Sequence, residues 1–85
     1  MSDYRPIACH IYERYELAIM HRQRLRVRWR DESGMPHLAT LVPENLETRE
    51  GEEFLIARDP GGERLRLRLD RILDARPVEP ASPSI

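Results

Sequence analysis

Two segments of the chain alternate arginine with apolar residues, and this pattern constrains the fold more than any other feature. They read RLRVRWR at 24–30 and RLRLRLD at 64–70. In a β-strand such alternation places one residue type on each face of the sheet, whereas a helix would scatter both types around its surface. The chain is therefore expected to build a sheet with one buried face, to which the two segments contribute Leu25, Val27, Trp29, Leu65, Leu67 and Leu69.

The rest of the chain supplies one helix and further strands. Apolar residues at helical spacing between Cys9 and about Met20 predict a short helix that starts near Cys9 or His10. Its end stays open, because Glu16 to Met20 fit the start of a strand equally well. Further strands are expected at 37–42, 53–58 and 72–78, and Phe54, Ile56, Leu38 and Leu41 are expected to join the core. Pro43 is expected to end the first of these strands, ahead of a polar connection over 43–52. The predicted fold is mainly β, a small antiparallel β-barrel or sandwich of about five or more strands with a short N-terminal α-helix.

A chain of 85 residues has room for one small domain. We expect that domain to span 1–78, with a disordered tail rich in proline and serine at 79–85. The sequence has no apolar run long enough to span a membrane and no signal-peptide pattern, so a cytoplasmic protein is expected. Pro36, Pro43 and charged residues on the predicted edge strands disfavour edge pairing, so we expect a monomer.

No arrangement of residues typical of an enzyme is present in the sequence. His10, His21 and His37 lie far apart and match no metal-binding spacing. Cys9 is the single cysteine, and in a helix it would point about 100° away from the adjacent His10, so the two do not form a catalytic pair. We therefore predict no catalytic activity, no cofactor and no metal site.

All fourteen basic residues of the chain are arginine. Seven of them fall on the predicted solvent faces of the two alternating strands: Arg24, Arg26, Arg28, Arg30, Arg64, Arg66 and Arg68. One interpretation is a ladder of guanidinium groups that binds the phosphates of RNA. The other is an ordinary polar strand face, whose arginines pair across strands with acids such as Glu52 and Glu53.

The predicted helix has a different character, because Tyr12, Glu13, Tyr15 and Glu16 place two carboxylates beside two aromatic rings. Carboxylates next to aromatic rings resemble phosphates next to bases, which suits a protein that occupies the RNA site of another protein. The alternative is an ordinary amphipathic helix with Tyr15 packed inward and Glu13 in solvent.

The order of these elements resembles the Rho-binding antiterminator (Rof) family. The resemblance runs from Tyr4 to about Val78 and rests on a Y-x-P-I-x-C opening at 4–9 and an L-R-L-D-R-I segment at 67–72. It implies an Sm-like fold and a partner, the transcription termination factor Rho. By binding the RNA-binding N-terminal region of Rho, such a protein blocks transcript loading and inhibits Rho-dependent termination.

The resemblance also implies a contact surface. Its residues would be Tyr12, Glu13 and Glu16, together with Arg49 from the 45–50 connection. One departure is that His10 and Ile11 stand where the family has two acidic residues. The alternative function is an Sm-like RNA-binding module that uses the arginine-rich strand face.

Overall fold

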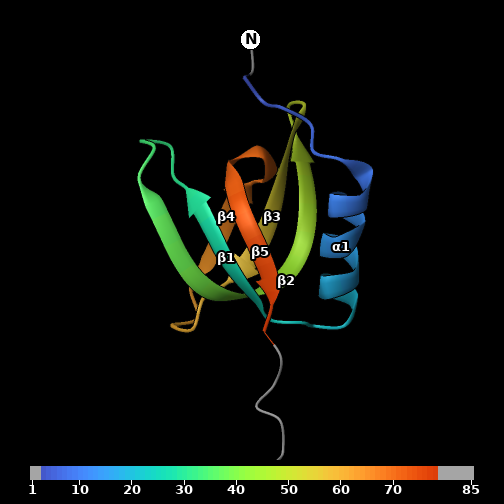
Figure 1. Cartoon of the computed structure of the whole chain (residues 1–85), viewed down its shortest axis with the longest axis vertical. Coiled ribbons are helices and arrows are strands. Elements are labelled where there is room, and N and C mark those ends of the chain that lie inside the picture. The colour runs from blue at the N-terminus through green and yellow to red at the C-terminus, as the bar shows by residue number, and fades with distance from the viewer. Residues whose placement is uncertain (1–2, 79–85) are drawn as a thin grey trace, which may run out of the picture.

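The computed structural model describes residues 3–78, which form one helix and one antiparallel sheet (Figure 1). The sheet has the strand order β4-β3-β2-β1-β5, so β4 and β5 are its edges and it is not closed into a barrel. The prediction of a mainly β fold, with an N-terminal helix and five antiparallel strands, is confirmed. The elements are α1 (Cys9–Met20), β1 (Leu25–Arg30), β2 (Pro36–Arg49), β3 (Glu52–Arg58), β4 (Arg64–Arg68), the 3-10 helix η1 (Leu69–Arg71) and β5 (Ile72–Pro77). The predicted tail at 79–85 lies outside the described residues.

Strand β2 is a single long strand that serves both halves of the sheet. Its first half pairs with β1, where Leu25 lies opposite Leu41, and its second half pairs with β3, where Leu46 lies opposite Leu55. The predicted strand end at Pro43 and the predicted polar connection over 43–52 are therefore wrong. The pairing register shifts between Pro43 and Asn45, and an irregularity of this kind accommodates a residue that has no N–H to donate.

The core lies on the inner face of this bent sheet and is completed by the helix. Val27 and Leu55 are 0% exposed, and the core cluster as a whole contains Tyr15, Ala18, Leu25, Val27, Leu41, Leu55, Ala57, Leu67 and Leu69. Because Leu55 and Ala57 point inward, Phe54 and Ile56 fall on the opposite face of β3, outside this cluster. The expectation that Phe54 joins the core is wrong, whereas Ile56 is buried as expected, at 8% exposure. Leu38 is also outside the core, since it is 56% exposed.

Helix α1 packs against β2 and contributes Tyr15 and Ala18 to the core. It ends in a Schellman motif: Arg22 has a φ of 51°, its N–H donates to the Ile19 carbonyl, and the N–H of Gln23 donates to the Ala18 carbonyl. This turn sends the chain straight into β1. Within residues 3–78, no helix is long and apolar enough to cross a membrane.

Candidate ligand-binding groove

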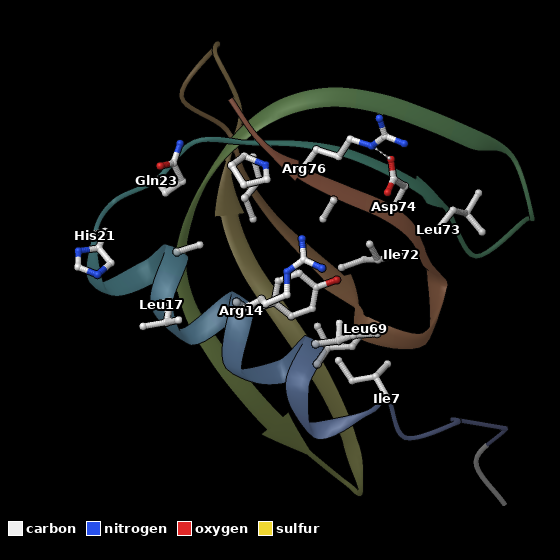
Figure 2. A pocket seen from close by; sticks show the side chains of 16 residues that line it. Ile7, Arg14, Leu17, His21, Gln23, Leu69, Ile72, Leu73, Asp74 and Arg76 are labelled. Carbon is white, nitrogen blue, oxygen red and sulfur yellow. Dashed lines mark hydrogen bonds and ion pairs between the residues drawn. The ribbon is translucent and has the colours of Figure 1, made fainter. Parts of the chain in front are cut away.

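A groove with a cavity volume of about 550 Å³ lies between α1 and the edge strand β5 (Figure 2). This volume is within the range of roughly 300–1,000 Å³ that is usual for small-molecule sites. Its lining is mainly apolar and comes from the helix, from η1, from β5 and from the segment that precedes α1. The apolar side chains are Ile7, Ile11, Leu17, Ala18, Leu25, Leu69, Ile72, Leu73, Ala75 and Pro77.

The sequence builds the two walls of the groove in different ways. On α1, Ile11, Tyr15 and Ala18 are four and three residues apart, so they share one face of the helix. The opposite wall is β5, which pairs with β1 along one edge only. The 3-10 turn at Leu69–Arg71 joins β4 to this wall and places the buried Leu69 at the base of the groove.

Arg14 is the charged residue of the helical wall. Its side chain extends from α1 over the groove (Figure 2). Within residues 3–78 it has no carboxylate within ion-pair distance. On the opposite wall, Arg76 Nε lies 3.0 Å from Asp74 Oδ2, so that pair is already satisfied. Arg14 is thus an unpaired cation beside an apolar floor.

Tyr15 supplies a hydroxyl to the same groove. The residue is only 6% exposed, and its hydroxyl makes no hydrogen bond among residues 3–78. Burial raises the pKa of Tyr15, the charge of Arg14 acts in the opposite direction, and the charge of Asp74 raises it further. The hydroxyl oxygen is not among the fully buried unpaired polar atoms of residues 3–78, so it is accessible from the groove although the ring is buried. The Tyr15 hydroxyl is therefore available to a polar group of a bound molecule.

Gln23 and His21 lie at the end of the groove where α1 leaves the sheet. The Gln23 amide is occupied, because Nε2 donates to the Val78 carbonyl at 2.8 Å and to the Arg24 carbonyl at 3.2 Å. These bonds tie the start of β1 to the end of β5. They fix the width of the groove at this end.

The residues predicted to bind a protein partner lie outside the groove. Tyr12 is half-buried, and burial followed by the charges of Glu53 and Glu16 raises its pKa. Glu13 and Glu16 are exposed on α1. Arg49 ends β2, with its Nε 3.5 Å from Glu47 Oε1. The structure thus places three of these residues on one helix and the fourth at the β2–β3 hairpin.

The seven arginines of the alternating segments are divided between two distant strands. Arg26, Arg28 and Arg30 are exposed on β1 and follow Arg24, whereas Arg64, Arg66 and Arg68 belong to β4. Strands β2 and β3 separate the two groups, so they do not form one continuous ladder.

The arginines of β4 are paired with acids, as the second interpretation of the pattern expects. Arg64 and Arg66 lie 3.5 Å from Glu44 and Glu47, respectively, and Arg68 lies 2.6 Å from Asp70. On the other side of the sheet, Arg24, Arg26 and Arg28 have no ion-pair partner among residues 3–78. Residues 3–78 also bring together no group of three or more His, Cys, Asp or Glu that could hold a metal ion.

Sequence reasoning did not identify Arg14 or the groove. The signal was present in part, because Arg14 is three residues after Ile11 and four before Ala18, on the apolar side of the helix. The second wall carries no such signal. Only the tertiary structure shows that β5 lies across from α1.

The chain was then compared with known proteins. The sequence model of the WYL domain family matches residues 10–77. No curated protein gives a significant match. Among solved structures, the fold is similar to that of Proteasome accessory factor B/C (PafBC) of Arthrobacter aurescens, with a TM-score of 0.72 and 18% sequence identity. That alignment covers 88% of this chain and 12% of the PafBC chain.

These findings overturn the resemblance to the Rho-binding antiterminator family. The WYL match extends from His10 to Pro77, whereas the resemblance rested on two short motifs. One of those motifs has a structural explanation: Leu67 and Leu69 are core residues, and Arg68 pairs with Asp70. The predicted antitermination through Rho and the alternative of an Sm-like RNA-binding module are both replaced by the WYL assignment.

Proposed function

Because the chain belongs to the WYL domain family, we propose that it is a ligand-sensing module of a transcriptional regulator and that its ligand binds between α1 and β5. The prediction that the chain is not an enzyme is confirmed by the family match, since the WYL domain is a non-enzymatic module. The observation that carries the proposed site is the groove itself, which combines an apolar floor with an unpaired Arg14 and the unbonded hydroxyl of Tyr15.

The likeness to PafBC supports the regulatory role. The chain spans 12% of the length of that protein, so the proposed module would act together with other domains. Regulators of transcription act where the DNA is, which in a bacterial cell is the cytoplasm. We therefore propose a cytoplasmic location, and the expectation that the chain is a monomer stays a prediction.

The arrangement of the walls offers a route for a signal. Helix α1 packs on β2, while the groove separates it from β5. A ligand held between the two walls favours the conformations in which they lie at the distance that it spans. The ligand shifts the equilibrium between two positions of α1, and the size of the shift is set by the difference in its affinity for the two positions. A neighbouring domain that contacts α1 would sense this shift.

The proposed site is tested with a small-molecule extract of cells and a pair of variants. Native mass spectrometry detects a bound compound, and its effect on Tm is then measured, since a ligand at 100 times its Kd stabilises a protein by about 2.7 kcal/mol. Leu17→Trp enlarges an exposed side chain of the groove, and Leu38→Trp makes the same change at an exposed position of β2 away from it. We expect Leu17→Trp to weaken binding at least about tenfold, equivalent to 1.4 kcal/mol, and Leu38→Trp to leave it unchanged. Equal behaviour of the two variants would exclude the groove as the site.

A further inference from the structure

We propose that the groove takes an amphipathic monocarboxylate, an aliphatic or aromatic acid whose hydrocarbon body lies on the apolar floor and whose carboxylate meets Arg14 and the Tyr15 hydroxyl. This inference rests on the proposed function, because it specifies the ligand of the same groove.

The first argument is the balance of charge along the groove. Its charged residues are Arg14 on one wall and the Asp74–Arg76 pair on the other. Since Asp74 and Arg76 neutralise each other at 3.0 Å, Arg14 is the cation without a partner. A guanidinium presents parallel N–H donors that match the two oxygens of a carboxylate, so a ligand carboxylate satisfies it best.

The second argument is the hydroxyl of Tyr15, which lines the same groove. It has no hydrogen bond among residues 3–78 and is close enough to Arg14 for that charge to act on its pKa. Its O–H is a donor, as are the N–H groups of Arg14. Two donors that line the same groove are both satisfied by an acceptor with more than one lone pair, which a carboxylate provides.

The third argument concerns what the groove does not suit. A phosphate ester or a nucleotide carries two or more negative charges and needs several donors. Here one unpaired arginine is available, and Asp74 on the opposite wall would repel additional negative charge. The apolar lining in turn requires a hydrocarbon body rather than a small hydrophilic acid. A single carboxylate on an apolar body therefore fits best.

The test uses octanoate and 1-octanol as probes, because they share a hydrocarbon chain and differ in charge. Each is titrated into the ¹⁵N-labelled chain, and Kd is obtained from the amide shifts of groove residues such as Ile11 and Ala75. We expect octanoate to bind at least about tenfold more tightly than 1-octanol, as a charge-assisted hydrogen bond predicts.

Variants then assign the carboxylate contact. Arg14→Gln is expected to weaken octanoate about tenfold or more and to leave 1-octanol unchanged, and Tyr15→Phe is expected to weaken octanoate several-fold. Arg64→Gln is the matched control, because it removes the same charge from β4 at the far edge of the sheet. It should change neither Kd.

The outcomes separate this inference from the proposed function. Equal affinity for the two probes, or no effect of Arg14→Gln, would overturn the carboxylate assignment. If octanoate fails to shift the groove while a compound from the cell extract does, the ligand class is wrong and the proposed sensing role stands. If neither binds, both proposals fail. Shifts of groove amides that follow protein concentration alone would mean that a second copy covers the groove, which also overturns the inference.

Discussion

Arg68 and Asp70 form a double hydrogen bond at the point where β4 becomes η1. Arg68 Nε donates to Asp70 Oδ1 at 2.6 Å, and Nη2 donates to Oδ2 at 3.0 Å. The two side chains are only 11% and 10% exposed. The Asp70 carboxylate also accepts from the backbone N–H of Arg5 at 3.1 Å, while the guanidinium lies 5.9 Å from the centre of the Tyr4 ring. This pair therefore connects the N-terminal segment to the base of the groove, where Leu69 lies between the two partners.

We expect Arg68→Ala to destabilise the domain by about 2–4 kcal/mol, because it leaves the nearly buried carboxylate of Asp70 without its partner. The measurement is the free energy of unfolding in urea. Arg76→Ala is the control, since Arg76 is paired with Asp74 at the same sequence spacing but is 78% exposed, and exposed pairs contribute about 0–1 kcal/mol. If Arg68→Ala lowers the free energy of unfolding by no more than Arg76→Ala does, the role given to the Arg68–Asp70 pair is wrong.

Two leucines test where the core lies. Leu55→Ala removes a fully buried side chain of β3 and should cost about 2–5 kcal/mol in the free energy of unfolding. Leu38→Ala changes an exposed position of β2 and should alter stability by less than about 0.5 kcal/mol. If chemical denaturation shows similar losses for both, the face of β2 or β3 that packs inward is wrongly assigned.

Asp31 should make stability depend on pH in the acid range. Hydrogen bonds from Ser33 and then His37 hold its pKa well below the usual value, and the backbone N–H groups of Met35 and Ser33 add to this. A carboxyl with a lowered pKa in the folded state stabilises the fold above its unfolded value of about 3.9, and that contribution is lost as the pH falls below it. Relative to the unaltered chain, Asp31→Asn should therefore lower Tm at pH 7, and the difference should narrow towards pH 2.

The measurement is Tm at several pH values between 7 and 2. Glu32→Gln serves as the control, because the exposed Glu32 in the same turn makes no hydrogen bond or ion pair among residues 3–78. It should reproduce the profile of the unaltered chain. If the difference in Tm between Asp31→Asn and the unaltered chain stays constant from pH 7 to pH 2, the prediction is wrong.

The Schellman motif at the end of α1 offers a stabilising change. Arg22 has a φ of 51°, which strains a residue with a Cβ, and glycine removes that strain. We expect Arg22→Gly to raise the free energy of unfolding by about 0.5–1 kcal/mol, after the entropy cost of glycine is counted. Glu13→Gly, at an exposed position inside the same helix, should lower it by about 1 kcal/mol. Thermal or urea unfolding should therefore show changes of opposite sign in the free energy of unfolding for the two variants.

Local patterns predicted most of the secondary structure. The helix was expected to start near Cys9 and does so, while its end at Met20 is a finding of the structure. The two alternating segments became β1 and β4 with Val27 and Leu67 in the core. These elements depend on contacts between near neighbours in the chain, which a periodic pattern records. The error at Pro43 shows the limit, because a proline disrupts a strand only where its missing N–H is needed. At Pro43 the shift in register removes that need.

The sequence by itself determined the start of the helix, most of the strands and the apolar face of each alternating segment, because side-chain periodicity follows directly from backbone geometry. Only the tertiary structure decided which surfaces face one another. The long β2 joins two halves of a bent sheet, so β5 comes to lie across from α1 and opens a groove lined by residues from 7 to 77. Arg14 and Asp74 are 60 residues apart in sequence, and no local pattern relates Arg14 to the Asp74–Arg76 pair. Their meeting depends on the order of the strands, which is fixed by the packing of the whole core.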